Sequence, residues 1–309
     1  MHIAQIGTGR VGRPTAYTIM CTELAETITV CDTKPGLAKA FAEELRHVTV
    51  SQNSDIEIIS CEHSKDIIGA NIILISAGKP RAPNVKMTRR DLALQNGQIV
   101  KEIVKSTITN NSGGKYIVIT NPVDAMAMVC KKYSCADFVI STGTNLETLR
   151  FRSKLASMLG VPVSSVEGWV AGEHGSDAVI LWSTVKVNGL NFKEYLKLSN
   201  KTLEKNLIDI YVKSVSKFII DNVGGTEYGP AASFRDIVRA IVINSNELLP
   251  VATLLKFVGI SDPVFVSVPV QLGESVGKSI FETLSSEEKN EIRVAAEAIY
   301  STFLTAIKC

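Results

Sequence analysis

The sequence contains no apolar run long enough to cross a bilayer, which takes roughly 18 consecutive apolar residues. Its first residues, MHIAQIGTGRVG, lack the basic and apolar regions of a signal peptide. The formal net charge is only +2 over 309 residues, so no strong field favours nucleic acid or a membrane surface. We therefore expect a folded cytoplasmic protein without nucleic-acid or membrane partners.

Patterns typical of metal sites and disulfide frameworks are also missing. Six cysteines lie scattered at positions 21, 31, 61, 130, 135 and 309, none in a C-x-x-C pair, and there are only four histidines. We expect no metal site. Cys130 and Cys135 are close enough in sequence to raise the question of a disulfide, but most cytosolic cysteines are reduced packing residues, and we expect the same here.

The first half alternates short, β-branched apolar runs with longer helical patterns. Strands are predicted at 2–6, 27–31, 56–60, 71–75, 115–120 and 136–141, and helices at 10–23, 36–48, 88–110 and 123–132. The strands are too apolar for a sheet that is wetted on one face. Such alternation indicates parallel pairing through right-handed crossovers. The fold class predicted is α/β, with a doubly wound, parallel six-stranded dinucleotide-binding (Rossmann) sheet.

The regular alternation of strands and helices ends at about residue 143. Helices are predicted at 145–159, 200–221, 230–247 and 286–307, strands at 166–171 and 178–187, and a hairpin at 251–257 and 264–272. This mixture indicates a second, α+β domain. We therefore expect a nucleotide-binding domain over residues 1–143 and a substrate domain over residues 144–309.

The segment GTGRVG at 7–12 fits the G-x-G-x-x-G fingerprint, follows a predicted strand and opens a predicted helix. In that context Gly7 allows a tight turn, Gly9 lets the backbone approach a pyrophosphate, and Gly12 lets helix and strand pack closely. Three glycines also occur in ordinary turns, but the flanking strand and helix favour dinucleotide binding.

Asp32 supplies the second part of this fingerprint, at the end of the second predicted strand. A carboxylate there can accept hydrogen bonds from ribose hydroxyls. It would repel a 2′-phosphate, so NAD is favoured over NADP. The alternative is an aspartate that only caps the following turn or helix.

Three further stretches carry groups suited to catalysis. They are TNPVD at 120–124, TNLETLRFR at 144–152 and GEHG at 172–175. The first follows the fifth strand at the edge where such sheets bind ligands. The second places Glu147 and Arg150 on one helix face. Singly, each has a simpler interpretation: a turn-forming Asn121, a surface ion pair, and a core histidine at position 174.

Together with AGKPRAP at 77–83, MTRRDL at 87–92 and GTEYGPA at 225–231, these motifs resemble the lactate/malate dehydrogenase family over nearly the whole chain. The resemblance implies NAD-dependent hydride transfer with a small 2-hydroxy or 2-keto acid. The segment with two arginines is similar to that of malate-specific members, which favours malate and oxaloacetate. Lactate, or both substrates, is the alternative. A non-catalytic NAD-binding regulator is the alternative from another class.

The resemblance also implies a role for each site residue. His174 would donate the proton, Glu147 would hold its other ring nitrogen, and Arg89 would polarise the carbonyl from a closing loop. The expected substrate-binding residues are Arg81, Arg89, Asn121, Arg150 and Thr226, with Arg81 facing the second carboxylate of oxaloacetate. The expected cofactor-binding residues are Gly7, Gly9, Arg10, Val11, Gly12, Asp32, Ala77, Gly78, Asn96, Thr120 and Asn121.

Two features depart from the family pattern. Glu147 stands where aspartate is usual, so a longer side chain has to pair with His174. Residues 84–86 lengthen the loop that carries Arg81, where malate enzymes commonly have a single glycine. The resemblance also implies self-association to a dimer or tetramer and a place in the tricarboxylic acid cycle.

Overall fold

The structure is a computed structural model that describes residues 1–79 and 89–308. Arg81 lies outside the described residues. The backbone of Arg89 begins helix α3, but its side chain is outside the described part.

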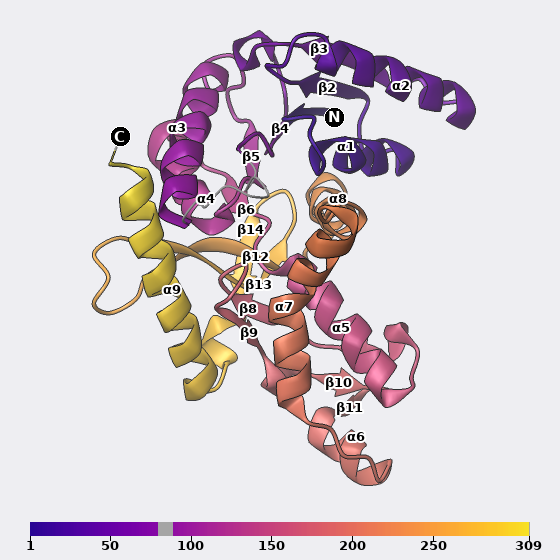
Figure 1. Ribbon diagram of the computed structural model, residues 1–309, viewed down its shortest axis with the longest axis vertical. Coiled ribbons are helices and arrows are strands. Elements are labelled where there is room, and N and C mark those ends of the chain that lie inside the picture. Colours follow the sequence, from indigo (N-terminus) through magenta and orange to yellow (C-terminus); the bar gives the residue numbers. More distant parts are fainter. Residues whose placement is uncertain (80–88, 309) are drawn as a thin grey trace.

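The first half forms the predicted alternation of strands and helices (Figure 1). The strands are β1 (His2–Ile6), β2 (Thr27–Cys31), β3 (Glu57–Cys61), β4 (Ile72–Ile75), β5 (Lys115–Val118) and β6 (Val139–Ser141), and the helices are α1 (Gly12–Cys21), α2 (Leu37–Gln52), α3 (Arg89–Thr107) and α4 (Val123–Ser134). The six strands pair in parallel in the order β3-β2-β1-β4-β5-β6. This order is that of a doubly wound dinucleotide-binding sheet, as predicted.

This sheet is buried on both faces, which explains its apolar strands. Along β4, Ile73 and Ile75 belong to one core cluster, and Ile72 and Leu74 belong to another. Because successive strand residues point to opposite faces, the two clusters lie on opposite sides. Helices α3, α4 and α9 (Ser286–Ala306) cover the first side, and α1, α2 and α8 (Tyr228–Val242) cover the second.

The second half mixes short strands with longer helices. Besides α8 and α9, it contains α5 (Asn145–Leu159), β7 (Val166–Glu167), β8 (Val170–Gly172), β9 (Ala178–Ile180), β10 (Lys186–Val187), β11 (Leu190–Asn191), α6 (Phe192–Leu198), α7 (Lys205–Val223), β12 (Glu247–Leu255), β13 (Val264–Leu272) and β14 (Val276–Ser279). Short 3-10 turns lie at Ser64–Asp66, Val163–Ser165, Trp182–Thr184 and Phe281–Thr283.

The two halves share one sheet, which the sequence patterns do not predict. The hairpin β12–β13 adds to β6 through the pair Ala252–Ser141, and β8 and β9 continue from β13. All these added strands pair antiparallel. The domain division after residue 143 therefore stays a prediction, because the hydrogen-bonded sheet runs across it.

Several predicted elements of the second half need correction. The helix predicted at 230–247 ends at Val242, because Asn244 and Asn246 adopt positive φ angles of 50° and 54° and the chain turns into β12. The strand predicted at 166–171 breaks at Gly168, whose φ is 132°. The strand predicted at 178–187 is divided by the turn at Trp182–Thr184.

The helix predicted at 200–221 begins only at Lys205, and the preceding helix α6 was not predicted. Helix α6 is capped by Asn191, whose side chain accepts a hydrogen bond from the Glu194 amide. Such a cap satisfies one of the free amides at a helix start.

Candidate active site

The glycine-rich turn joins β1 to α1 and packs against the residues that follow β4. Gly7 has a φ of 90°, and an added Cβ would lie 2.5 Å from the Ala77 nitrogen. At Gly12 an added Cβ would lie 1.9 Å from the Gly7 carbonyl oxygen. Each of these two glycines is therefore required by a close approach within the protein.

Gly9 differs, because an added Cβ there would meet no described atom within 4 Å. Its φ also does not require glycine. No protein contact explains this glycine, whereas a pyrophosphate lying on the backbone at the amino end of α1 would. The three glycines thus fit a dinucleotide cofactor.

Asp32 directly follows β2, beside this turn. One carboxylate oxygen accepts hydrogen bonds from the Thr8 amide at 2.8 Å and the Thr8 hydroxyl at 3.1 Å. The other accepts from the Lys34 amide at 3.0 Å. The capping contact considered from the sequence is therefore present, and the same side chain also braces the glycine-rich turn.

Arg10 and Val11, both expected at the cofactor, have protein contacts of their own. The Arg10 guanidinium forms an ion pair with Glu227 and donates to the Val223 carbonyl at 3.3 Å. Thr226, which is half-buried, lies directly before Glu227. Val11 is the residue before helix α1, and its carbonyl accepts the Thr15 amide. Arg10 thus links the nucleotide turn to the loop that carries Thr226.

Asn96 on α3 connects the segments that follow β4 and β5. Its side-chain oxygen accepts a hydrogen bond from the Lys79 amide at 2.7 Å, and its amide group donates to the Asn121 carbonyl at 2.7 Å.

The segments after β4 and β5 also contact each other directly. Thr120 donates to the Ala77 carbonyl at 2.7 Å. The peptide between Asn121 and Pro122 is cis. At Gly78 an added Cβ would lie 2.7 Å from a Thr120 methyl carbon. These residues hold the carboxyl edge of the sheet together.

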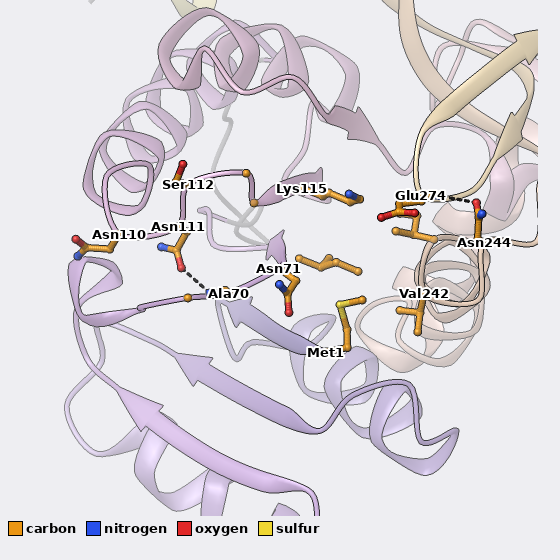
Figure 2. Close-up of a pocket in the computed structure, with 15 residues that line it drawn as sticks. Met1, Ala70, Asn71, Asn110, Asn111, Ser112, Lys115, Val242, Asn244 and Glu274 are labelled. Atoms are coloured by element: carbon orange, nitrogen blue, oxygen red, sulfur yellow. Dashed lines mark hydrogen bonds between the residues drawn. The ribbon is translucent and has the colours of Figure 1, made fainter.

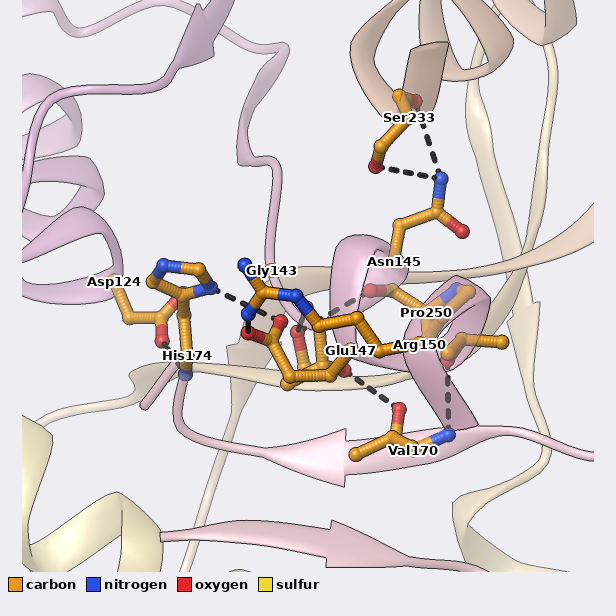
Figure 3. Close-up of polar contacts among 12 residues, drawn as sticks. Asp124, Gly143, Asn145, Glu147, Arg150, Val170, His174, Ser233 and Pro250 are labelled. Atoms are coloured by element: carbon orange, nitrogen blue, oxygen red, sulfur yellow. Dashed lines mark hydrogen bonds and ion pairs between the residues drawn. The ribbon is translucent and has the colours of Figure 1, made fainter. Parts of the chain in front are cut away.

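The side chains of Glu147, Arg150 and His174 point toward one another, as Figure 3 shows. The Glu147 carboxylate accepts from His174 Nδ1 at 3.0 Å and from Arg150 Nη1 at 3.1 Å. The side chain of Glu147 is 3% exposed, against 11% for Arg150 and 25% for His174. Glutamate in place of aspartate therefore reaches both partners, and the Nε2 atom of His174 has no hydrogen bond to another described residue.

Asp124 is a fourth member of this group that the sequence analysis missed. It is buried, accepts the His174 backbone amide at 3.0 Å and accepts the Ser141 hydroxyl at 2.6 Å. It lies within the quoted TNPVD motif. Its place in the first turn of the helix predicted at 123–132, just beyond the fifth predicted strand, was the available signal.

Burial and charge act against each other in this group. Burial alone would lower the pKa of His174, but the charge and hydrogen bond of Glu147 and the charge of Asp124 raise it above the usual value. Burial also opposes ionisation of Glu147, yet His174 and Arg150 hold its pKa below the usual range. At Asp124 burial prevails over its hydrogen bonds and raises the pKa.

A pocket in the described part of the chain lies away from these residues (Figure 2). It has a volume of about 420 Å³ and is lined at the amino ends of β1, β4 and β5, by residues that include Met1, Asn71 and Lys115, and by Asn244 and Glu274. Parallel sheets of this kind bind cofactors at the opposite, carboxyl edge. We therefore do not assign this pocket to the cofactor.

The described residues were also compared with the requirements of a membrane span and of a metal site. Within 1–79 and 89–308, no helix combines the length and apolar character of a membrane span. Nor does any group of three or more histidine, cysteine, aspartate or glutamate side chains in these ranges have an arrangement suited to a metal ion.

Comparison with known proteins agrees with this geometry. Residues 1–138 match the lactate/malate dehydrogenase NAD binding domain, and residues 144–306 match the α/β C-terminal domain of the same family. A malate dehydrogenase of Sulfurisphaera tokodaii is 37% identical over 306 residues, covering 99% of this chain and 96% of the relative. An L-lactate dehydrogenase of Thermoanaerobacter sp. is 33% identical, covering 97% of each.

Among solved structures, a minor L-lactate dehydrogenase from Enterococcus mundtii superposes with a TM-score of 0.92 at 28% identity, covering 100% of this chain and 99% of that one. The two family models together match most of the chain. The chain therefore belongs to the lactate/malate dehydrogenase family, as an oxidoreductase that acts on 2-hydroxy acids with NAD as its cofactor.

Proposed function

We propose that the protein interconverts malate and oxaloacetate. The part-buried contact of His174 with Glu147, beside Arg150, carries the keto-acid chemistry of the proposal, because such a reduction needs a proton donor next to a carboxylate-binding cation. Two malate dehydrogenases, from Sulfurisphaera tokodaii and Sulfolobus acidocaldarius, are 37% and 36% identical to the chain. The arginine-bearing segment at 77–92 supports the same substrate.

His174 is the proposed proton donor. When bound, NADH supplies the hydride, and the protein has to supply a proton to the oxygen of the former carbonyl. Glu147 holds Nδ1 at 3.0 Å, so Nδ1 carries a hydrogen and Nε2 is the nitrogen that delivers the proton. Because Glu147 and Asp124 raise the pKa of His174, the imidazolium form persists to a higher pH than for a free histidine. In malate oxidation the neutral ring would take the proton back.

Arg150 is the proposed anchor for the carboxylate beside the reacting carbon. Among the described residues its guanidinium donates only to Glu147, which leaves further N–H groups for a bidentate bond to a carboxylate. We assign Asn121 and Thr226 to the pocket wall and Arg89 to polarisation of the carbonyl. Arg81 would face the second carboxylate of oxaloacetate.

Asp124 is proposed as a positioning residue. It fixes the backbone of His174 through the amide at 3.0 Å, and Ser141 fixes Asp124 at 2.6 Å. Both partners of the histidine are buried acids from different elements, α4 and α5. Glu147 thus binds the imidazole ring of His174, and Asp124 binds its backbone amide.

L-Lactate is the second candidate substrate. It is supported by L-lactate dehydrogenases that are 33% identical and by the lactate dehydrogenase fold match at a TM-score of 0.92. A non-catalytic NAD-binding regulator would have no need of a proton donor paired with a buried carboxylate, so the geometry at His174 argues against it.

Steady-state kinetics with oxaloacetate and pyruvate, each with NADH and NADPH, test the proposal. We expect the highest kcat/KM for oxaloacetate with NADH, and a small but measurable rate with pyruvate. A preference for pyruvate would indicate a lactate dehydrogenase. Inactivity on both substrates would favour the non-catalytic NAD-binding regulator.

Two variants sharpen this test. Arg81→Gln should cost oxaloacetate reduction at least ~2 kcal/mol, as for a lost charge-assisted pair, and leave pyruvate reduction equal or better. Asp32→Ser should narrow the gap in kcat/KM between NADH and NADPH. If wild type already uses NADPH as well as NADH, Asp32 does not select the cofactor.

We extend three further expectations to this chain as part of the proposal. They are a cytoplasmic location, a place in the tricarboxylic acid cycle, and self-association to a dimer or tetramer. Size measurement by light scattering at several protein concentrations tests the last, and a monomer throughout would contradict it.

A further inference from the structure

Two cysteines face each other at the nucleotide edge of the sheet, outside the catalytic group. Cys31 is the last residue of β2 and Cys61 is the last residue of β3. They are direct partners in the parallel register of these strands. Directly paired residues on neighbouring strands point to the same face, and both side chains pack into the same core cluster.

This spacing suits a covalent link between the two sulfur atoms. Neighbouring strands lie about 4.8 Å apart, which falls within the range of roughly 4.4–6.8 Å between Cα atoms of disulfide-linked cysteines. Both residues end their strands, so a small adjustment there leaves the rest of the ladder in place.

The two thiols differ in access to solvent. Cys31 is 1% exposed, whereas Cys61 is half-buried and is followed by the exposed residues Glu62 and His63. A small oxidant therefore reaches Cys61 first, and Cys31 lies behind it.

The two thiols also differ in acidity. A hydrogen bond with the Cys31 thiol lowers the pKa of Cys61, against the opposing effects of burial and the Asp66 carboxylate. The same hydrogen bond, together with burial and nearby acids, raises the pKa of Cys31. The accessible thiol is thus the better source of thiolate, the reactive form.

The pair is connected to the glycine-rich turn through the main chain. The Cys31 carbonyl accepts the Gly7 amide at 2.8 Å, and the Cys61 carbonyl accepts the Asp32 amide at 3.3 Å. Asp32 in turn binds the Thr8 amide. A shift of the two strand ends toward each other would therefore move Asp32 and the turn at Gly7.

We propose that Cys61 and Cys31 form a peroxide-reactive thiol pair whose oxidation to a disulfide lowers the affinity of the protein for NADH. The thiolate of Cys61 attacks one oxygen of hydrogen peroxide, the O–O bond breaks, and water leaves after protonation. The resulting sulfenic acid is attacked by the Cys31 sulfur, the S–O bond breaks, and a second water leaves with the Cys31 proton. Two thiols lose two electrons and two protons in total, and one peroxide becomes two waters.

Peptide mapping tests the thiol chemistry without reference to activity. Reduced full-length protein is treated with hydrogen peroxide, quenched with catalase, alkylated, digested and analysed by mass spectrometry. We expect a cross-linked peptide joining Cys31 to Cys61 that disappears after dithiothreitol. In Cys31→Ser, Cys61 should stop at a sulfenic acid that dimedone traps. If both cysteines are still free to be alkylated after the peroxide treatment, or if they oxidise without forming a cross-link, the proposed thiol pair is refuted.

Fluorescence titration with NADH tests the consequence, which rests on the proposed function because it assumes that Asp32 binds the cofactor. Peroxide should raise the NADH Kd at least about fivefold, equivalent to roughly 1 kcal/mol, and dithiothreitol should restore it. Cys61→Ser and Cys61→Ala should not respond to peroxide. Cys135→Ser is the matched control, because Cys135 directly follows α4, is exposed and lies in no disulfide, and it should respond as wild type does.

The remaining outcomes separate the two proposals. A mapped disulfide with an unchanged NADH Kd overturns the effect on the cofactor site. If the reduced protein does not bind NADH, the proposed function fails, while the peptide map still decides the thiol pair.

Discussion

The two sides of the site are built by different means. The nucleotide side, around Gly7, Gly9 and Gly12, depends on backbone shape and on close approaches between β1, α1 and the segment after β4. The catalytic side depends on buried charges contributed by α4, by α5 and by the loop after β8. The three glycines of the first side lie within six positions of one another, although Gly7 also packs against the distant Ala77. The second side joins Asp124, Glu147 and His174, which only tertiary packing brings together.

This difference leads to different expectations for mutations. On the nucleotide side, added volume should disturb either folding or cofactor binding, depending on the glycine. On the catalytic side, changes that keep the shape but remove a charge should alter the reaction and its pH dependence while the fold persists.

The largest effect is expected at His174. His174→Asn removes the proton donor but keeps a polar group near the position of Nδ1, so kcat for keto-acid reduction should fall by ~10²–10⁴, as for lost general acid catalysis. NADH affinity, measured by fluorescence, should stay within about twofold of wild type, less than ~0.5 kcal/mol. A loss of activity below about tenfold would remove His174 from the proton transfer.

Two alanine substitutions compare the glycines directly. In Gly12→Ala the new Cβ would lie 1.9 Å from the Gly7 oxygen, so unfolding free energy should fall by ~1–3 kcal/mol or more through overpacking. In Gly9→Ala no described atom lies within 4 Å, so stability should change by less than ~0.5 kcal/mol.

The matched measurement is NADH titration of Gly9→Ala. Its affinity should fall at least about tenfold, roughly 1.4 kcal/mol, because the methyl group occupies the path of the pyrophosphate. A Gly9→Ala protein that binds NADH normally would mean that the backbone of this turn does not approach the cofactor.

The sequence patterns predicted the nucleotide side better than the catalytic side for the same reason. The strand at 2–6, the turn at 7–12 and Asp32 follow one fingerprint of fixed spacing within the first 32 residues, and all lie where expected. The addition of β12 and β13 to β6 depends on pairing between residues more than a hundred positions apart, such as Ser141 and Ala252. The local periodicity of the sequence does not indicate which strand pairs with β6.

Individual side chains show the same limit. The contact between Glu147 and His174 could be expected only from the family resemblance. Helix and loop patterns in the sequence do not indicate how far apart the two side chains lie in space. Asp124 was overlooked because its carboxylate meets a backbone amide 50 positions away. The pairing of Arg10 with Glu227 joins segments from opposite ends of the chain, and no motif marks it.

Removal of the Glu147 charge should change the pH profile of the catalytic side. In Glu147→Gln the main group that raises the pKa of His174 is lost, so that pKa falls. Because reduction needs the imidazolium, activity is present below the pKa of His174 and declines as pH rises through it. The high-pH limb of kcat/KM for oxaloacetate reduction should therefore move to lower pH. Glu147→Asp keeps the charge and serves as control. An unmoved limb in Glu147→Gln would mean that the pair does not act together in the enzyme.

The smallest effect is expected at Asp124, whose charge raises the pKa of His174 less than Glu147 does. Asp124→Asn keeps an oxygen for the His174 amide and leaves an amide group that can donate to the Ser141 hydroxyl, so the position of the loop should be retained. The high-pH limb should then move in the same direction as in Glu147→Gln, but less, with kcat near the wild-type value at low pH.

Asp124→Ala removes the hydrogen bonds at 3.0 Å and 2.6 Å as well, so its kcat should fall at every pH, because the histidine backbone is no longer held. The contrast between the two variants separates the charge of Asp124 from its hydrogen bonds. If Asp124→Asn leaves the limb unmoved while Asp124→Ala lowers kcat throughout, Asp124 acts on His174 through position alone. If both variants behave as wild type, the bond between Asp124 and the His174 amide has no part in catalysis, and the histidine is held by Glu147 and its own loop.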